Sequence, residues 1–151
     1  MHTLVRRYLF TAFGFLVVGI VLGVIMLARR ELGGVWGHPY LATAHTHTVL
    51  VGFVMFMIFG VAQWMFPRPQ KGDVRYSPAL AEAVYWLLTV STVLRLTGEL
   101  ARAAWDVPQL KWAILTGGIG QAVGFVAYIW NMRSRIRQAG SKLREDKGER
   151  F

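Results

Sequence analysis

The sequence predicts an all-α membrane protein in which four transmembrane helices form an antiparallel bundle. Two observations predict this fold. First, 54% of the 151 residues are hydrophobic, and they fall into four long blocks instead of being spread along the chain. Second, each block is about as long as the roughly 20 apolar residues that an α-helix needs to cross the hydrocarbon core. We expect helices at about residues 8–28, 41–66, 78–100 and 110–132, within one domain that covers residues 1–132.

The first block lies between two pairs of basic residues, Arg6 with Arg7 and Arg29 with Arg30. A cleavable signal peptide also carries basic residues before an apolar stretch. This block, however, is longer than the apolar region of a signal peptide, and charged residues follow it instead of a small-residue cleavage site. We therefore expect a retained membrane helix.

Turn-forming residues mark the ends of the other helices. A glycine-rich loop and Pro39 precede the second helix, and Pro67 follows it. Ser77 followed by Pro78 is typical of an N-cap and a first-turn proline, which places the start of the third helix there. The short loops imply that consecutive helices are antiparallel neighbours.

The net charge of +9 would also suit a nucleic-acid-binding protein, but the positions of the charges indicate otherwise. In a four-span chain most basic residues fall on one side: before the first helix, between the second and third, and in a basic tail over residues 133–151. The positive-inside rule then places both termini and the tail in the cytoplasm, next to anionic lipid of the cell's inner membrane. We expect the lipid bilayer as a partner and no nucleic acid.

The chain contains no cysteine. This excludes disulfides, thiolate metal sites, iron–sulfur clusters and heme attached through cysteine. A bound transition metal must then use other ligands, of which imidazole is the commonest. The histidines are His2, His38, His45 and His47.

Two of these histidines form the sequence His45-Thr46-His47 near the start of the second helix. Ionisable side chains at membrane depth are costly and usually serve a pathway, a partner or a ligand. Two positions along a helix differ by about 200° of rotation, so His45 and His47 point to nearly opposite faces. This geometry argues against one tetrahedral zinc ion held by both side chains. It favours two separate acceptors, such as a heme on each side, or a heme and a neighbouring subunit.

The segment His45-Thr-His47-Thr-Val-Leu50, which continues through Gly60 and Trp64 to Pro67, resembles a helix of a known family. It is similar to the tenth transmembrane helix of the catalytic subunit of heme-copper oxygen reductases and nitric oxide reductases. The resemblance implies heme b as cofactor, with His45 as ligand of a high-spin-type heme and His47 as ligand of a low-spin-type heme. The third and fourth predicted helices are compatible with the two helices that follow in the family.

The chain departs from the family pattern in its remaining histidines. The family's catalytic subunit is much longer and has a second low-spin ligand and three further histidines that bind copper or iron, whereas only His2 and His38 remain here. We therefore expect no copper from this chain alone and no complete oxygen-reducing centre, and whether the chain is an enzyme stays open. A second copy is expected to complete heme ligation in a homo-oligomer, a dimer or a trimer.

A second group of charged residues lies on and after the third helix. Arg95 and Glu99 are four residues apart on one face, which is typical of an ion pair packed within the bundle. The alternative interpretation assigns Arg95, Arg102 or Lys111 to heme propionates, whose charge cations would compensate. The resemblance also implies basic partners for propionates near the loop between the last two helices.

Two pairs of glycines are spaced four residues apart, Gly19 with Gly23 and Gly120 with Gly124. Small residues at this spacing let helices approach closely in lipid. They would equally leave room for a flat macrocycle.

These observations predict a heme-binding integral membrane protein, similar to a b-type cytochrome, that transfers electrons or binds a diatomic gas such as NO or O2. The alternative hypothesis is a non-catalytic accessory or assembly subunit within a larger respiratory complex, a terminal oxidase or nitric oxide reductase. A small transporter or channel would need a continuous polar path, to which four spans with one buried ion pair give little support.

Overall fold

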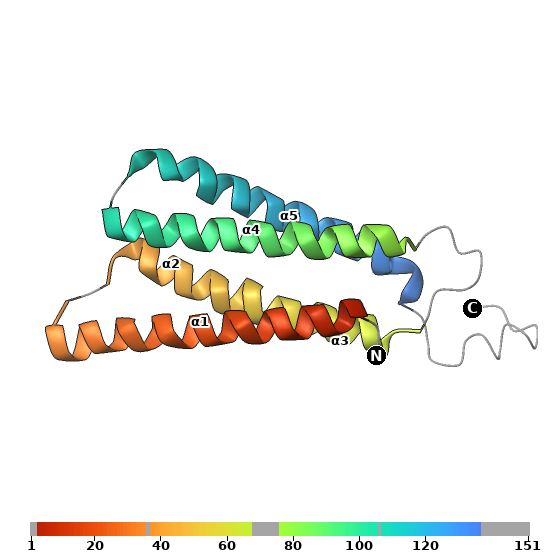
Figure 1. Ribbon diagram of the computed structural model, residues 1–151, viewed down its shortest axis with the longest axis horizontal. Helices are drawn as coiled ribbons and strands as arrows, with labels where there is room; N and C mark the ends of the chain where they lie inside the picture. The colour runs from red at the N-terminus through yellow and green to blue at the C-terminus, as the bar shows by residue number, and fades with distance from the viewer. Residues whose placement is uncertain (1–2, 36, 68–75, 106, 137–151) are drawn as a thin grey trace, which may run out of the picture.

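A computed structural model of the chain describes residues 3–35, 37–67, 76–105 and 107–136. Four long helical spans run alternately in opposite directions (Figure 1). Each is long and apolar enough to cross a membrane, which confirms the predicted all-helical class with four membrane helices. Most of the predicted basic tail, residues 137–151, lies outside the described residues. The cytoplasmic placement of the termini stays a prediction.

The first span is α1 (Thr3–Gly33). It ends where Gly34 adopts a φ of +61°, a left-handed conformation that glycine adopts without strain. The amide of Gly34 donates to the Arg30 carbonyl at 3.1 Å, and that of Val35 donates to the Arg29 carbonyl at 3.3 Å. These two bonds satisfy carbonyl groups in the last turn and stop the helix.

The second span has three parts: α2 (Pro39–His47), the π-helical segment η1 (Thr48–Met55) and α3 (Phe56–Met65). His38 caps its start, because the amide of Tyr40 donates to Nδ1 of His38 at 3.3 Å. The sequence does not predict the π-helical segment. It begins directly after His47.

The third span is α4 (Pro78–Trp105), and the predicted N-cap is confirmed, since the amide of Leu80 donates to the hydroxyl of Ser77 at 3.2 Å. The last span comprises the short η2 (Pro108–Leu110), α5 (Lys111–Met132) and η3 (Arg133–Arg135). The first, third and fourth spans are longer than the sequence blocks indicate, because helical backbone continues into polar residues beyond the apolar core, whereas the second nearly coincides with its block.

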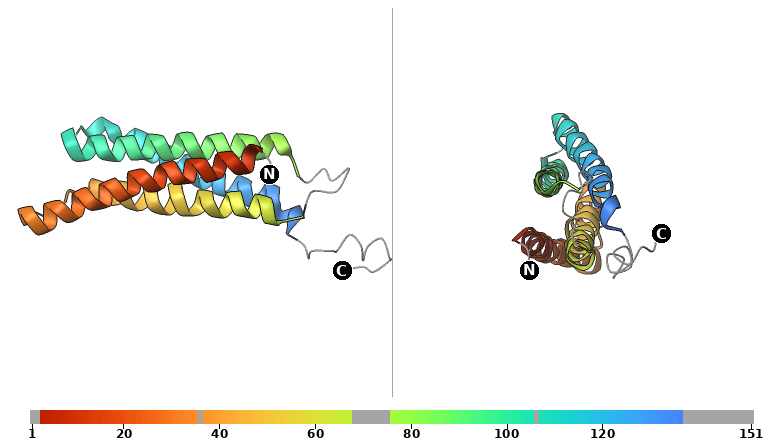
Figure 2. Two further views of the ribbon diagram at one scale, coloured as in Figure 1. Left: turned by 60° about the horizontal axis from the view of Figure 1, so that its bottom comes forward. Right: turned by 90° about the vertical axis from the view of Figure 1, so that its right-hand side faces the viewer.

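The helices are closest at the end where α1 begins and α5 ends, and they spread toward the opposite end. There α1 and α5 diverge, while α2 and α4 stay packed together (Figures 1 and 2). In the part of the chain that the structure describes, α1 and α5 make no close backbone approach. The closely packed half holds an aromatic core, and the spread half holds the histidine pair.

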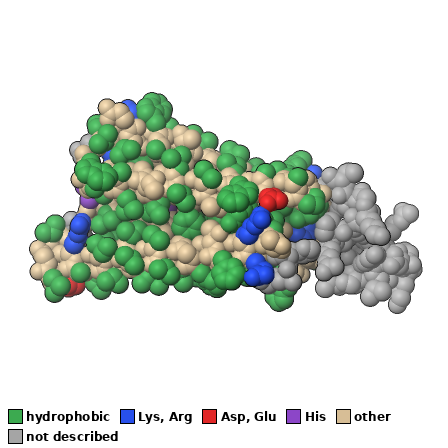
Figure 3. All heavy atoms as spheres, in the orientation of Figure 1, with side chains coloured by type: hydrophobic (Ala, Val, Ile, Leu, Met, Phe, Trp, Pro, Cys, Tyr) green, Lys and Arg blue, Asp and Glu red, His purple; other side chains and the backbone are tan. Residues whose placement is uncertain are grey.

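The aromatic core is built from ring contacts between all four spans. Tyr8 of α1 meets Tyr85 of α4 edge-on, with ring centroids 5.0 Å apart. Phe59 of α3 stacks on Tyr128 of α5 at 3.8 Å, and the Tyr128 hydroxyl donates to the Phe59 carbonyl at 3.0 Å. Phe56 is completely buried between these pairs. The outer surface is largely apolar (Figure 3), as lipid-facing helices require.

Side chains of neighbouring helices pack directly against the paired glycines. A Cβ built on Gly19 would lie 2.6 Å from Cγ2 of Val49, and one built on Gly124 would lie 2.5 Å from Cδ2 of Leu88. Such distances are far below van der Waals contact, so only glycine permits these approaches. At Gly19 and Gly124 the close-packing interpretation is confirmed, and no room for a macrocycle remains beside these two glycines.

Candidate functional site

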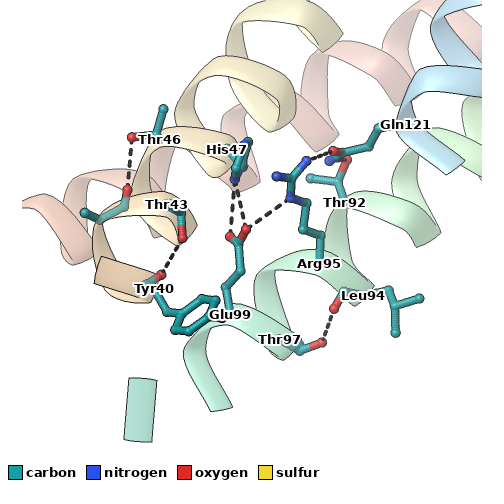
Figure 4. A network of polar contacts seen from close by, with 11 residues as sticks. Tyr40, Thr43, Thr46, His47, Thr92, Leu94, Arg95, Thr97, Glu99 and Gln121 are labelled. Atoms are coloured by element: carbon teal, nitrogen blue, oxygen red, sulfur yellow. Dashed lines mark hydrogen bonds and ion pairs between the residues drawn. The ribbon is translucent and has the colours of Figure 1, made fainter. Parts of the chain in front are cut away.

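His45 and His47 project from the last turn of α2 toward different helices. His45 faces α1, where its Nδ1 lies 3.0 Å from the carbonyl oxygen of Gly19. His47 faces α4, where its Nδ1 lies 3.1 and 3.3 Å from the two carboxylate oxygens of Glu99 (Figure 4). The opposite orientation predicted from their spacing is therefore confirmed.

In each of the two imidazoles, Nδ1 makes the hydrogen bond that holds the ring in place. A backbone carbonyl accepts hydrogen bonds, as a carboxylate does, so we assign Nδ1 of each ring as the donor. The lone pair then resides on Nε2. Within the described ranges, no hydrogen bond involves Nε2 of His45 or His47. Metal-ligating histidines show this arrangement, in which one nitrogen donates to a carbonyl or carboxylate and the other binds the metal.

Glu99 belongs to a buried polar network that joins three spans (Figure 4). Its side chain is 2% exposed, and it accepts a bond from Nε of Arg95 at 3.1 Å. Arg95 also donates to Gln121 of α5 at 3.0 Å, and Gln121 donates to Thr92 at 3.1 Å. The predicted ion pair within the bundle is confirmed. The network fixes the carboxylate that orients His47.

Gly117 lets α5 approach this network. A Cβ at Gly117 would lie 2.8 Å from both Cβ of Arg95 and the carbonyl oxygen of Ser91. A Cβ at the next residue, Gly118, would lie 3.4 Å from Nη1 of Arg95, so the guanidinium also lies close to α5. Arg95 makes its structural contacts through Nε and one terminal nitrogen.

Arg102 and Lys111 lie at the loop that joins α4 to α5. Arg102 donates to the carbonyl of Val107 at 3.2 Å, and its guanidinium lies 5.2 Å from the ring of Tyr40. The ammonium of Lys111 lies 5.5 Å from the ring of Trp112. The structure thus joins Arg95 to His47 through Glu99 and gives Arg102 and Lys111 local partners. A role in binding propionates stays a prediction for all three cations.

A π-helical segment starts immediately after His47. A π-helix has one more residue per hydrogen-bonded turn than an α-helix, and it occurs frequently at functional sites. The first residue of this segment, Thr48, is completely buried. Its hydroxyl has no hydrogen-bond partner among the described residues. The backbone departs from regular α-helix directly beside the histidine pair.

A pocket of about 280 Å³ opens beside His45 at the spread end of the bundle. The surface is hollowed at this end, and histidine atoms are visible there (Figure 3). Residues of α1 and of the following loop and helix form its walls: Gly23, Met26, Leu27, Arg30, Gly37 and His45. The sequence predictions did not include Arg30 among the site residues. Its spacing from Gly23, two helical turns, would have placed it on the histidine-facing side.

A comparison with protein families covers nearly the whole chain. Residues 3–144 match the family described as cytochrome c and quinol oxidase polypeptide I. The chain belongs to this family. The match includes all four spans, whereas the sequence resemblance rested mainly on one helix. Members of the cytochrome c and quinol oxidase polypeptide I family typically bind hemes. No solved structure matches the chain.

The arrangement of possible metal ligands in this chain decides which kind of metal group it could bind. Across the residues that the structure describes, no three His, Asp or Glu side chains converge on a common point. Each histidine instead offers a single Nε2 on its own face of the helix. A lone imidazole suits iron that already has four porphyrin nitrogens, because one axial bond completes its attachment. The residues present therefore fit heme.

Proposed function

We propose that this chain is a heme-binding membrane protein in which His45 and His47 each provide an axial ligand to heme b. The paired hydrogen bonds of Nδ1 carry the proposal, because they leave both Nε2 atoms as ligands and fix both rings. When bound, heme would supply a one-electron redox couple or an open position for a diatomic gas such as NO or O2. The function is then electron transfer or gas binding in the membrane.

The partners of the two rings support different roles for the two histidines. A carboxylate acceptor raises the basicity of a ligating imidazole more than a neutral carbonyl does. His47, which donates to Glu99, is therefore the stronger electron donor, as a low-spin ligand should be. His45 donates to the Gly19 carbonyl and suits the high-spin position. This assignment agrees with the roles that the resemblance implies.

The size of the site supports a homo-oligomer. A pocket of about 280 Å³ is at the lower limit of small-molecule sites, so one chain covers only part of a heme. A second copy in a symmetric dimer or trimer would cover the rest and supply a missing axial ligand. The proposal also includes the cytoplasmic termini and the location in the inner membrane, both of which rest on the distribution of basic residues.

One observation favours a second candidate function. The family match extends over all four spans, yet the described residues hold no cluster that could bind copper. A chain that keeps the fold without the copper ligands would suit an accessory or assembly subunit of a terminal oxidase or nitric oxide reductase. Such a subunit would co-purify with its larger partner and carry no pigment of its own.

The test is heme binding by ligand variants of the full chain, purified in detergent from cells supplied with iron and porphyrin precursor. His45→Ala and His47→Ala should each weaken or shift the Soret band, since each removes one axial nitrogen. His38→Asn is the matched control, because His38 is exposed and asparagine keeps its role as N-cap. Circular dichroism confirms that the variants remain folded. Identical spectra for all three variants and the unsubstituted chain would refute the ligand assignment.

A further inference from the structure

We propose that Arg30 binds the propionate carboxylates of the heme whose iron His45 holds. This inference rests on the proposed function and extends it to a residue at the end of α1. It starts from the pocket that Arg30 and His45 line together.

Arg30 lies on the side of α1 that faces His45. The ring of His45 lies directly against Gly23, where a built Cβ would be 3.1 Å from its Cε1 atom. Arg30 follows Gly23 by seven residues, which is two turns on the same face and about 10 Å further toward the helix end. Propionates extend outward from the macrocycle edge, so an iron at His45 would bring them toward Arg30.

The pocket lining has an apolar part and a charged part, and the charged part lies toward the end of α1. Met26 and Leu27 provide apolar side chains, and two glycines add none, so this part suits the face of a porphyrin. Among the described lining residues, Arg30 is the one Lys or Arg side chain. A planar guanidinium binds carboxylates through two parallel hydrogen bonds, which a point charge does not do.

Arg30 is also available for this contact. Its Nε donates to the adjacent Glu31 at 2.7 Å, and its side chain is 50% exposed. Within the described residues its two terminal nitrogens make no hydrogen bond or ion pair. Glu31 therefore orients the base of the guanidinium and leaves the terminal nitrogens for a carboxylate. Arg95, by comparison, is already held by Glu99 and Gln121.

The experiment measures the rate at which heme b leaves the purified full-length protein for apomyoglobin in excess. Arg30→Gln should release heme about 10- to 100-fold faster, the loss expected for one or two hydrogen bonds to a charged group. Arg29→Gln is the matched control, because the neighbouring arginine does not line the pocket. Arg30→Lys should release heme at a rate between those of the unsubstituted chain and Arg30→Gln, since lysine keeps the charge without the paired hydrogen bonds.

Heme dimethyl ester supplies the second arm, because its propionates carry no charge. The unsubstituted chain should release the ester as fast as Arg30→Gln releases heme b. Arg30→Gln should release heme b and the ester at the same rate. Equal release of heme b from Arg30→Gln and Arg29→Gln would overturn the role of Arg30 while leaving the proposed function intact. Failure of the unsubstituted chain to bind either heme would instead refute the proposed function.

Discussion

The buried pair of Arg95 and Glu99 should contribute much of the stability of the spread half of the bundle. Glu99 is 2% exposed and accepts bonds from both Arg95 and His47. Glu99→Gln keeps the size of the side chain and one acceptor oxygen, but it leaves the guanidinium charge uncompensated in a site of low dielectric. Removing one partner of a buried pair costs about 3–5 kcal/mol, and we expect a loss in the free energy of unfolding of this order.

The assay is reversible unfolding in mixed micelles, titrated with a denaturing detergent. Glu82→Gln is the matched control, because Glu82 accepts a bond from Arg7 at 2.6 Å but is 54% exposed. An exposed pair is worth at most about 1 kcal/mol. The double variant Arg95→Gln/Glu99→Gln removes both charges and should be more stable than Glu99→Gln alone. A loss for Glu99→Gln no larger than that for Glu82→Gln would contradict a buried ion pair. So would a double variant whose loss is the sum of those for Arg95→Gln and Glu99→Gln alone.

The same unfolding assay tests two further features of the packing. Gly117→Ala should lower the free energy of unfolding by about 1–3 kcal/mol, because the new methyl would lie 2.8 Å from the Ser91 carbonyl oxygen. Gly14→Ala is the control and should cost nothing, because a Cβ there has nothing within 4 Å. Equal losses for the two variants would contradict the close approach at Gly117. Arg135→Gln should cost about 3 kcal/mol, because the 5%-exposed guanidinium donates to three backbone carbonyls at the end of the second span. Arg133→Gln, on the exposed side of the same turn, should cost less than about 1 kcal/mol, and a reversed order would refute the capping role.

The features predicted correctly from the sequence depend on local periodicity. The four membrane helices follow from block length, the opposite directions of His45 and His47 follow from helical rotation, and the N-cap follows from Ser77 with Pro78. The ion pair of Arg95 with Glu99 follows from the same spacing rule.

The features that the sequence did not reveal depend on contacts between distant segments. The π-helical segment lies where Gly52 packs against Phe15 of α1, and no local propensity signals that approach. Arg135 falls in a charge-rich segment assigned to the basic tail, yet it is buried because it satisfies carbonyls of the second span. Arg30 lines the pocket because α1 and α2 lie side by side, and its spacing from Gly23 is the one local signal of that position.

We propose that the imidazoles of His45 and His47, each with Nε2 free of hydrogen bonds among the described residues, hold heme in the membrane. The most direct measurement is the oxidised and reduced absorption spectrum of the unsubstituted protein, purified in detergent after growth with ample iron and porphyrin precursor. We expect a Soret band that shifts on reduction, together with a pyridine adduct typical of heme b. A folded, colourless protein that also fails to take up added hemin would contradict the claim.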